Sequence, residues 1–506
     1  MLRILGSNRR LCHGMSRRDF LYVGGLGAAG LQLTDLLRGQ AAAQELADPS
    51  APALRSFGRA KSIILLHLYG SPSQLEWADP KPDAPVEIRG ELGWIPSTLP
   101  GCDVCELLPN MAKVMDRTTV IRSMTHPYPI HGVAYALTGT PTIDVAMELA
   151  PHDPRHWPYF ASVVEYVDAL RAQAEGRPPA ALTTGVPPNI ALPFAFSSHR
   201  VGEVPRAGPY AAFLGSRWNP VWTDYVGQAN KSIDKTLAEK RFTDPDPYLG
   251  LAPDSYFVMP SATAPQPGVT LDRMNRRRSL LAQFDAARGQ LDKSYAAQQF
   301  DQQQETAFAL LASDRLRGAL DLRHEPTETR DLYGSTLFGQ GCLAARRLVE
   351  AGSRVVSVFW DEYGLAGDAW DTHYDHFKRM RQALCPGLDM AWYGLITDLD
   401  RRGLLDDTLV VCTSEHGRTP RFSGTGRDHW SRVYTSMVAG GGTARGRVVG
   451  ASDKIGSDVA DRPVSPKDLL ATMYHLLGID HRQTLRDALD RPLPLVDGEV
   501  VQEVLA

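Results

Sequence analysis

The last third of the chain alternates helix-like and strand-like patterns in a regular order. A helical pattern at residues 339–351 precedes an apolar run at 353–360, and a second helical pattern at about 386–402 precedes an apolar run at 408–412. Helices that alternate with apolar strands form a mainly parallel sheet that helices cover on both sides. We therefore expect an α/β sandwich with a mainly parallel central sheet and helices on both faces.

Other segments extend this pattern toward both ends of the chain. Short apolar runs at residues 63–68, 118–121 and 433–438 predict buried strands, and residues 107–115 predict a helix. The last predicted helix begins after Ser465, because a serine followed by a proline and then an acidic residue is typical of a helix N-terminus. These segments are expected to belong to the same α/β unit.

The length of 506 residues would accommodate two or three average domains. The pattern favours instead one large domain over residues 44–506. From about residue 151 to 270 the sequence is rich in Pro, Gly and aromatic residues and has no sustained period, so we expect an irregular insertion that packs against the main sheet. Long helices are expected to follow over residues 271–322.

Residues 1–43 have the layout of a twin-arginine export signal. Arg17 and Arg18 precede a mildly apolar stretch at residues 22–37, and three alanines at 41–43 offer small residues at the point of cleavage. The alternative to an export signal is that the two arginines lie beside an apolar helix by chance. We expect the twin-arginine machinery, which carries folded proteins, to export this chain to the periplasm or beyond the cell.

The net charge argues against nucleic acid as a partner, and the cysteine content argues against a disulfide-built fold. The formal net charge is −4, and residues 1–43 hold six of the basic residues and two of the acidic ones, so the remainder is more acidic. An acidic protein has no general attraction for nucleic acid, and we expect none as a partner. The cysteines are too few for a disulfide-built scaffold. Cys102 and Cys105 form either a local disulfide or two ordinary thiols, and Cys412 is expected in the core.

Carboxylates and imidazoles gather after the ends of the predicted strands. Two pairs follow strands in the sequence and a fifth residue lies on a returning loop: Glu415 with His416, Asp371 with His373, and His429. Open α/β sheets place their ligand sites at the carboxyl ends of parallel strands, so these side chains are expected to meet. Such a mixture of oxygen and nitrogen ligands suits zinc, manganese or iron better than calcium. We therefore expect one or two divalent metal ions as cofactors.

The sequence around Glu415 resembles a known signature. Thr413-Ser414-Glu415-His416-Gly417 is similar to the Ser-Asp-His-Gly motif of the alkaline phosphatase and sulfatase superfamily. In that superfamily the Asp and His of the motif bind one metal, and a later His, here His429, completes the other site. The resemblance implies that Asp371 and His373 stand for the earlier Asp and His ligands.

More closely, most of the chain after residue 43 resembles a bacterial family of twin-arginine-exported proteins, domain of unknown function 1501, which is related to sulfatases. Its recurring motifs occur here in the same order, at residues 79–82, 122–124, 370–373, 417–420, 426–430 and 448–453. The resemblance implies an alkaline-phosphatase-like fold. It implies no particular reaction, because the family has no settled one.

The chain departs from the metallophosphatase pattern after its first strand. In metallophosphatases this strand ends in an Asp metal ligand, which a Thr, Ser or modified Cys nucleophile follows, whereas this chain reads Leu68-Tyr69-Gly70-Ser71-Pro72-Ser73. Ser73 is the first nucleophile candidate and Ser71 the second, although Ser-Pro-Ser is also ordinary turn sequence. No Cys-x-Pro-x-Arg motif occurs, so formylglycine-dependent sulfatase chemistry is not expected.

Nearby polar residues are candidates for contact with the substrate. Arg418 is expected to be catalytic and Arg427 to bind substrate. Both could hold an anionic group of the substrate through bidentate contacts. For Arg418 the alternative is a pairing with a structural carboxylate. Asp428 is either a ligand or a residue that orients one. His131, like His126, follows a predicted strand and could line the cleft, with a structural role as its alternative.

Two functions from different classes follow from these residues. The first is an exported metal-dependent hydrolase of phosphate or sulfate esters, whose substrate is a small molecule or a polysaccharide. The second is a non-catalytic cell-envelope binding or structural protein that kept the fold and lost the nucleophile. A metal-dependent isomerase or mutase of the same superfamily is a third. The sequence leaves the metal, the substrate and the oligomeric state open.

Overall fold

The computed structural model describes residues 56–506, apart from 132, 140–142, 152, 154, 202–205, 238–239, 261–312, 366–368 and 488. The predicted export signal lies outside the described residues, and so does most of the helical stretch predicted at 271–322. All described residues belong to one unit, Ser56–Ala506.

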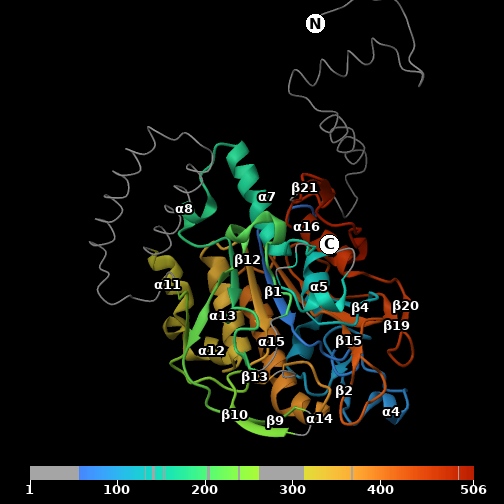
Figure 1. The fold of residues 1–506 in the computed structure, drawn as a ribbon. Helices are drawn as coiled ribbons and strands as arrows, with labels where there is room; N and C mark the ends of the chain where they lie inside the picture. The colour runs from blue at the N-terminus through green and yellow to red at the C-terminus, as the bar shows by residue number, and fades with distance from the viewer. Residues whose placement is uncertain are drawn as a thin grey trace, which may run out of the picture. The chain divides into compact units, whose positions relative to one another are not determined.

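An eight-stranded sheet forms the centre of this unit (Figure 1). From one edge to the other its strands are β18 (Arg447–Val449), β4 (Thr118–Met124), β17 (Tyr434–Ala439), β14 (Thr408–Thr413), β1 (Ser62–Leu68), β12 (Val355–Trp360), β5 (Asn189–Leu192) and β7 (Val221–Trp222). β17 is antiparallel to both of its neighbours, and the other neighbouring strands are parallel. The predicted α/β class with a mainly parallel sheet is confirmed.

The middle strands are apolar along most of their length because both of their faces are covered. Every residue of β1, β12 and β14 is buried. β1 lies between the other two, with Leu66 opposite Val358 on one side and opposite Cys412 on the other. These strands are the ones that the apolar runs at residues 63–68, 353–360 and 408–412 predict. Cys412 lies in the core as expected.

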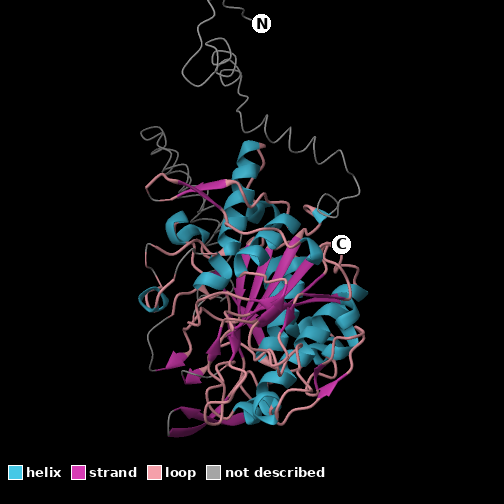
Figure 2. Ribbon diagram, turned by 90° about the vertical axis from the view of Figure 1, so that its right-hand side faces the viewer, coloured by secondary structure: helices cyan, strands magenta, loops and turns pink. Residues whose placement is uncertain are grey.

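Helices pack on both faces of the sheet (Figure 2). The longest are α7 (Phe160–Ala174), α13 (Leu337–Glu350), α15 (Cys385–Arg401) and α16 (Pro466–Leu476). On α13, a Cβ added at Gly341 would stand 3.1 Å from the side chain of Val358. The hydroxyl of Tyr159, just before α7, lies 2.7 Å from that of Ser357. Because residues 357 and 358 of β12 point to opposite faces, α13 and α7 cover opposite sides of the sheet.

Shorter elements connect these layers. The short helices include α4 (Val86–Arg89), η1 (Met111–Arg117), α5 (Ala134–Thr138), α6 (Val145–Glu148), α8 (Ala180–Thr184), α11 (Asp314–Leu320), α12 (Thr327–Tyr333) and α14 (His376–Arg379). Two-stranded ribbons include β2 (Trp94–Ile95) with β3 (Val104–Cys105) and β15 (Gly417–Arg418) with β16 (His429–Trp430).

Two predicted helix starts have different outcomes. The side chain of Ser465 accepts the N–H of Asp468, and the Asp468 carboxylate accepts the N–H of Ser465, so the start of α16 is confirmed. The helix predicted from residue 107 is wrong in its start, because the structure has a 3-10 helix that begins at Met111. There the Asp389 carboxylate of α15 accepts the N–H groups of Asn110 and Met111, at 2.9 and 2.7 Å.

The segment expected as an irregular insertion holds regular elements. β5 pairs with β12, and β7 extends the same edge of the main sheet. Farther along the segment, β9 (Ser232–Leu237) and β10 (Lys240–Pro245) form an antiparallel hairpin, and β8 (Asp224–Val226) pairs with β11 (Tyr256–Val258). β5 is a short strand with prolines on both sides, so it has too few residues for the alternation of buried and exposed positions to show in the sequence.

None of the helices described has the length and hydropathy needed to cross a bilayer.

Candidate metal centre

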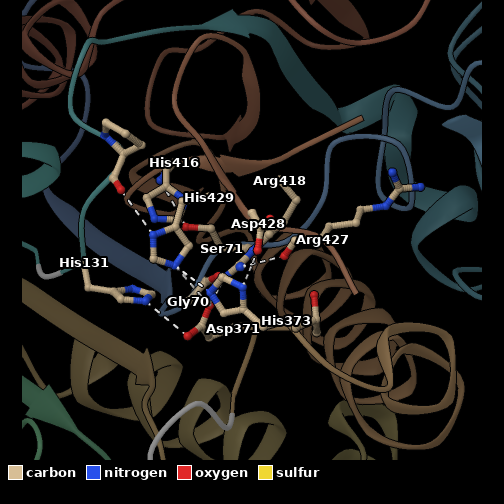
Figure 3. A network of polar contacts seen from close by, with 12 residues as sticks. Gly70, Ser71, His131, Asp371, His373, His416, Arg418, Arg427, Asp428 and His429 are labelled. Carbon is tan, nitrogen blue, oxygen red and sulfur yellow. Dashed lines mark hydrogen bonds and ion pairs between the residues drawn. The ribbon is translucent and has the colours of Figure 1, made fainter. Parts of the chain in front are cut away.

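Loops that leave the carboxyl ends of β4, β1, β12 and β14 converge at one edge of the sheet (Figure 3). The segment that enters the antiparallel strand β17 arrives at the same edge. Together they gather Gly70, Ser71, His131, Asp371, His373, Glu415, His416, Arg418 and His429. All five predicted metal ligands therefore lie in one region. They fall into two groups that share His131: one with Asp371, His373 and His429, and one with Glu415 and His416.

Asp371, His373 and His429 form a triangle of potential ligand atoms, called here the triad. Nε2 of His373 is 3.1 Å from Oδ1 of Asp371 and 3.1 Å from Nε2 of His429, which is 3.3 Å from the same Oδ1. In a tetrahedral site with metal–ligand bonds of about 2.0 Å, ligand atoms stand roughly 3.3 Å apart. The triangle therefore has the dimensions of one face of a metal coordination sphere.

The two imidazoles of the triad are oriented by contacts on their other ring nitrogens. Nδ1 of His373 lies 2.8 Å from the Asp428 carboxylate, and Nδ1 of His429 lies 3.2 Å from the carbonyl oxygen of Pro129. A proton on each Nδ1 satisfies these acceptors and leaves the Nε2 lone pairs facing each other and Asp371. Metal-binding histidines are commonly held in this way. Of its two predicted roles, the contact of Asp428 with His373 fits that of the orienting residue.

The triad is open on one side. The side chain of His373 is 32% exposed and that of His429 is 21% exposed, whereas Asp371 is buried. An ion held by three protein ligands with one side toward solvent keeps a position for water or substrate, which is the arrangement of catalytic zinc sites. Structural zinc sites instead use four protein ligands.

The second group, Glu415 with His416 and His131, lies deeper, and all three of its residues are buried. His131 stands between the groups, with Nε2 3.1 Å from Asp371 Oδ2 and Nδ1 3.3 Å from Glu415 Oε1. The backbone N–H of Gly70 donates to the same Oε1 at 2.7 Å. Nε2 of His416 is buried and has no hydrogen-bond partner among the residues that the structure describes. Because a buried nitrogen lone pair is costly to leave unpaired, this group also fits a cation. His131, predicted to contact substrate, is thus a candidate ligand or bridge.

The two carboxylates of the site are held ionised. Burial would raise the pKa of Asp371, but the Arg418 guanidinium and His131 hold it well below its usual range. Burial would likewise raise the pKa of Glu415, but contacts with His131 and His67 keep it well below the usual value. Both oxygen ligands therefore carry the negative charge that a divalent ion requires.

The histidines differ in their charge because they differ in their partners. Burial lowers the pKa of His416 well below its ordinary value, and the nearby His429 adds to this effect. Burial also lowers the pKa of His429, although Asp371 opposes it. The hydrogen bond with Asp371 raises the pKa of His373. For His131, burial lowers the pKa, but Asp371 and Glu415 outweigh it and raise the value to about 9.

Arg418 is fully buried and ties the loops of the site together. Its guanidinium donates to the carbonyl oxygens of Ser71 and Arg427, both at 3.1 Å, and to that of Gly70, and it pairs with the Asp371 carboxylate. Of its two predicted roles, the structure supports the pairing with a carboxylate. The catalytic clamp lacks support, because a substrate could reach the guanidinium only after these bonds broke.

Arg427 points away from the imidazoles (Figure 3). Its guanidinium is buried, pairs with Glu76 at 2.6 Å, donates to the carbonyl oxygen of Ile88 at 2.7 Å and lies 3.9 Å from the ring centre of Phe422. The predicted contact between Arg427 and substrate therefore gains no support from the orientation of this side chain. The sequence did not reveal the orientation of Arg427, because its partner Glu76 lies 351 residues away in the chain.

Neither serine of the Ser-Pro-Ser sequence faces the open side of the triad. Ser71 is buried, has a φ of 70° that non-glycine residues rarely adopt, and accepts the N–H of His416 on its hydroxyl at 3.1 Å. The hydroxyl of Ser73 is also buried and lies beside Glu76. The expectation that Ser73 is the nucleophile gains no support from these positions, and Ser71 is the serine that touches the metal-ligand loops.

Three residues that support the site are not among the predicted site residues. His67, in the middle of β1, places Nε2 3.3 Å from the Glu415 carboxylate. Glu76 and His376 contact each other behind the triad, at 3.3 Å. For His67 a signal existed, because an imidazole within an otherwise apolar buried strand needs a polar partner. No such signal marks Glu76. His126, whose Nε2 is 2.6 Å from the Glu415 carbonyl oxygen, has the structural role that was its alternative.

The cysteines show no disulfide among the described residues, where Cys102 and Cys105 are both buried free thiols. This agrees with the second of the two alternatives for the pair. Neither thiol is part of the two groups of ligands at the sheet edge.

Comparison with known proteins gives one strong match. A family model described as "Protein of unknown function (DUF1501)" matches residues 60–505. No curated protein matches the chain. Among solved structures, the PsFucS1 sulfatase from Pseudoalteromonas sp. is 11% identical, with 90% of this chain and 75% of that chain covered and a TM-score of 0.37.

Two further solved structures are complexes. Ps i-CgsB with k-i-k-neocarrahexaose is 11% identical, with coverage of 83% and 72% and a TM-score of 0.36. BT4656 with its substrate D-glucosamine-2-N,6-O-disulfate is 13% identical, with coverage of 88% and 82% and a TM-score of 0.30. Similarities of this size carry no inference about the activity of this chain.

Proposed function

This chain belongs to the DUF1501 family, whose description assigns no activity, and from the geometry of its triad we propose that it is a metal-dependent hydrolase of phosphate or sulfate esters. The observation that carries the proposal is the triangle of Asp371, His373 and His429, with sides of 3.1, 3.1 and 3.3 Å and one open side. These dimensions fit a divalent metal ion, and the open side would leave room for a substrate.

A divalent ion bound there would polarise an ester oxygen and lower the pKa of a bound water. The residues of the chain have three tasks. The triad would hold the ion, with Asp428 and the Pro129 carbonyl orienting its imidazoles. Arg418 keeps Asp371 ionised and in place. The loop after β1 packs against Asp371 at Gly70 and would keep water from the buried side of the ligands.

The second group of ligands favours ester hydrolysis over other metal chemistry. A triad of two histidines and one carboxylate also occurs in iron oxygenases, which use a single ion. Here Glu415, His416 and His131 offer a second cation position beside the triad. Pairs of metal ions stabilise both the attacking and the leaving oxygen of phosphoester-type reactions. The resemblance of residues 413–417 to the alkaline phosphatase and sulfatase signature supports the same class, in which a carbohydrate ester is one candidate substrate.

With both serines buried, a metal-activated water is the favoured nucleophile. Export by the twin-arginine route remains a prediction of residues 1–43, and it would place the substrate outside the cytoplasm.

A non-catalytic binding protein is the second candidate. It is favoured by the absence of a carboxylate directly after β1, where this chain has Tyr69, Gly70 and Ser71. Such a protein would bind the ion and an anionic ligand without turnover.

Hydrolysis of p-nitrophenyl phosphate and p-nitrophenyl sulfate by the purified chain, after reconstitution with zinc, manganese or iron, tests the proposal. We expect turnover that falls at least about a thousand-fold, or about 4 kcal/mol of transition-state stabilisation, in a His373→Ala/His429→Ala variant. His324→Ala is the matched control, because His324 is an exposed histidine outside the site. A metal-loaded wild type that hydrolyses neither ester nor a panel of sugar sulfates and phosphates would favour the binding protein.

A further inference from the structure

The two loops that carry the triad are linked behind it by one buried carboxylate. Glu76, on the segment after β1, is 2% exposed. Its Oε1 lies 2.6 Å from Nη2 of Arg427, and its Oε2 lies 3.3 Å from Nε2 of His376. Burial would raise the pKa of Glu76, but Arg427 and His376 outweigh it and lower the value to about 2. The carboxylate is therefore ionised and balances the buried Arg427.

Each partner of Glu76 belongs to one ligand loop. His376 begins α14, three residues after His373, and its Nδ1 is 2.8 Å from the hydroxyl of Thr372. Arg427 stands two residues before His429 on the loop that ends in β16. A shift of Glu76 would therefore move both loops relative to each other.

The two loops are also packed without a gap. The backbone N–H of Arg427 donates to the carbonyl oxygen of Thr372 at 3.1 Å. A Cβ added at Gly426 would stand 2.1 Å from the carbonyl oxygen of His373. The backbones of the two loops therefore touch directly, and Glu76 adds a buried side-chain link between them through His376 and Arg427.

We propose that Glu76 is a positioning residue that sets the spacing of the triad ligands, by holding His376 of one ligand loop and Arg427 of the other. The inference rests on the metal centre of the proposed function. It does not place Glu76 on the metal or on the substrate. Outer contacts that orient metal ligands change metal affinity by about 10- to 100-fold when they are lost.

The test compares the full chain with Glu76→Gln and Glu76→Asp variants, using Co²⁺ as the probe. Affinity for Co²⁺ and its visible absorption, which reports coordination geometry, are measured beside the melting temperature. We expect Glu76→Gln to weaken Co²⁺ binding by about 10- to 100-fold and to change the spectrum, and Glu76→Asp to recover part of both. The control is Asp398→Asn, which breaks a different buried ion pair, with Arg346 at 2.9 Å, on α15.

The outcomes separate three cases. A folded Glu76→Gln variant with wild-type affinity and spectrum overturns the inference, and so does an equal loss of affinity in Asp398→Asn, because the effect would then be one of general stability. A wild type that binds no Co²⁺ contradicts the proposed function itself. If Glu76→Gln does not fold, His376→Gln removes one link without stranding a buried charge, and the same two readouts decide.

Discussion

Both oxygens of the Asp371 carboxylate are engaged, which fixes its plane within the site. Oδ1 contacts Arg418 and the two triad imidazoles, and Oδ2 lies 3.1 Å from His131. A carboxylate offers about four acceptor positions, so the pairing with Arg418 leaves Oδ1 able to bind an ion. In the proposed metal centre, Arg418 would therefore act on Asp371 and not on the substrate.

At the same scale, Ser73→Ala is expected to leave kcat/KM and metal content unchanged, because the Ser73 hydroxyl lies beside Glu76 and not beside the triad. Steady-state kinetics on the metal-loaded protein measure this. Removing a true nucleophile typically costs at least about 10⁴-fold. A loss of that size in a Ser73→Ala variant with full metal content would restore the serine as nucleophile and contradict a metal-activated water.

The residue types and their positions after strands predicted which side chains meet. They did not predict the direction in which each side chain points. Glu415 and His416 follow a strand end, so their place at the sheet edge could be read from the sequence. Arg418 lies two residues after His416, and Arg427 lies two residues before His429. The Arg418 guanidinium nevertheless points into the site and the Arg427 guanidinium away from it. The direction depends on partners that fold in from the segment after β1, and local sequence does not show them.

At the scale of elements, the turn after β1 presses against the loop after β12. Gly70 has a φ of 86°, and a Cβ added there would stand 2.3 Å from the backbone nitrogen of Asp371. This close approach is why the turn requires glycine and why the Asp371 loop has little freedom.

Gly70→Ala is therefore expected to lower both stability and metal affinity. Overpacking costs about 1–3 kcal/mol in addition to the strain of a positive φ. Gly101→Ala separates the two effects, because Gly101 has a similar φ of 77° but nothing within 4 Å of an added Cβ. Thermal unfolding and Co²⁺ titration of both variants measure the difference. If Gly70→Ala and Gly101→Ala lose the same stability, and Gly70→Ala keeps its metal affinity, the close approach of Gly70 to Asp371 is contradicted.

Elements with a strong local signal were predictable, and those that depend on neighbours were not. Strands β1, β12 and β14 are buried on both faces and are continuous apolar runs, so the sequence predicts them directly. β5 has four residues and becomes a strand by pairing with β12. The start of η1 depends on the Asp389 carboxylate of α15, which lies far away in the sequence.

At the scale of the whole unit, the sheet order brings the site together. β14, β1 and β12 are adjacent and parallel, so the residues that follow them, Glu415, Gly70 and Asp371, meet although they are far apart in the sequence. The alternation of strands and helices predicted a parallel sheet, but it could not give the order of the strands. The order is what places His131 between the two groups of ligands.

The metal content of the purified chain, measured by inductively coupled plasma mass spectrometry, is the most direct test of the metal centre. We expect about one zinc, manganese or iron ion or more per wild-type chain and per His324→Ala control, and loss of that ion in a His373→Ala/His429→Ala variant that remains folded by circular dichroism. A folded wild type that is free of metal, and stays so after reconstitution with each of these ions, would contradict the metal centre.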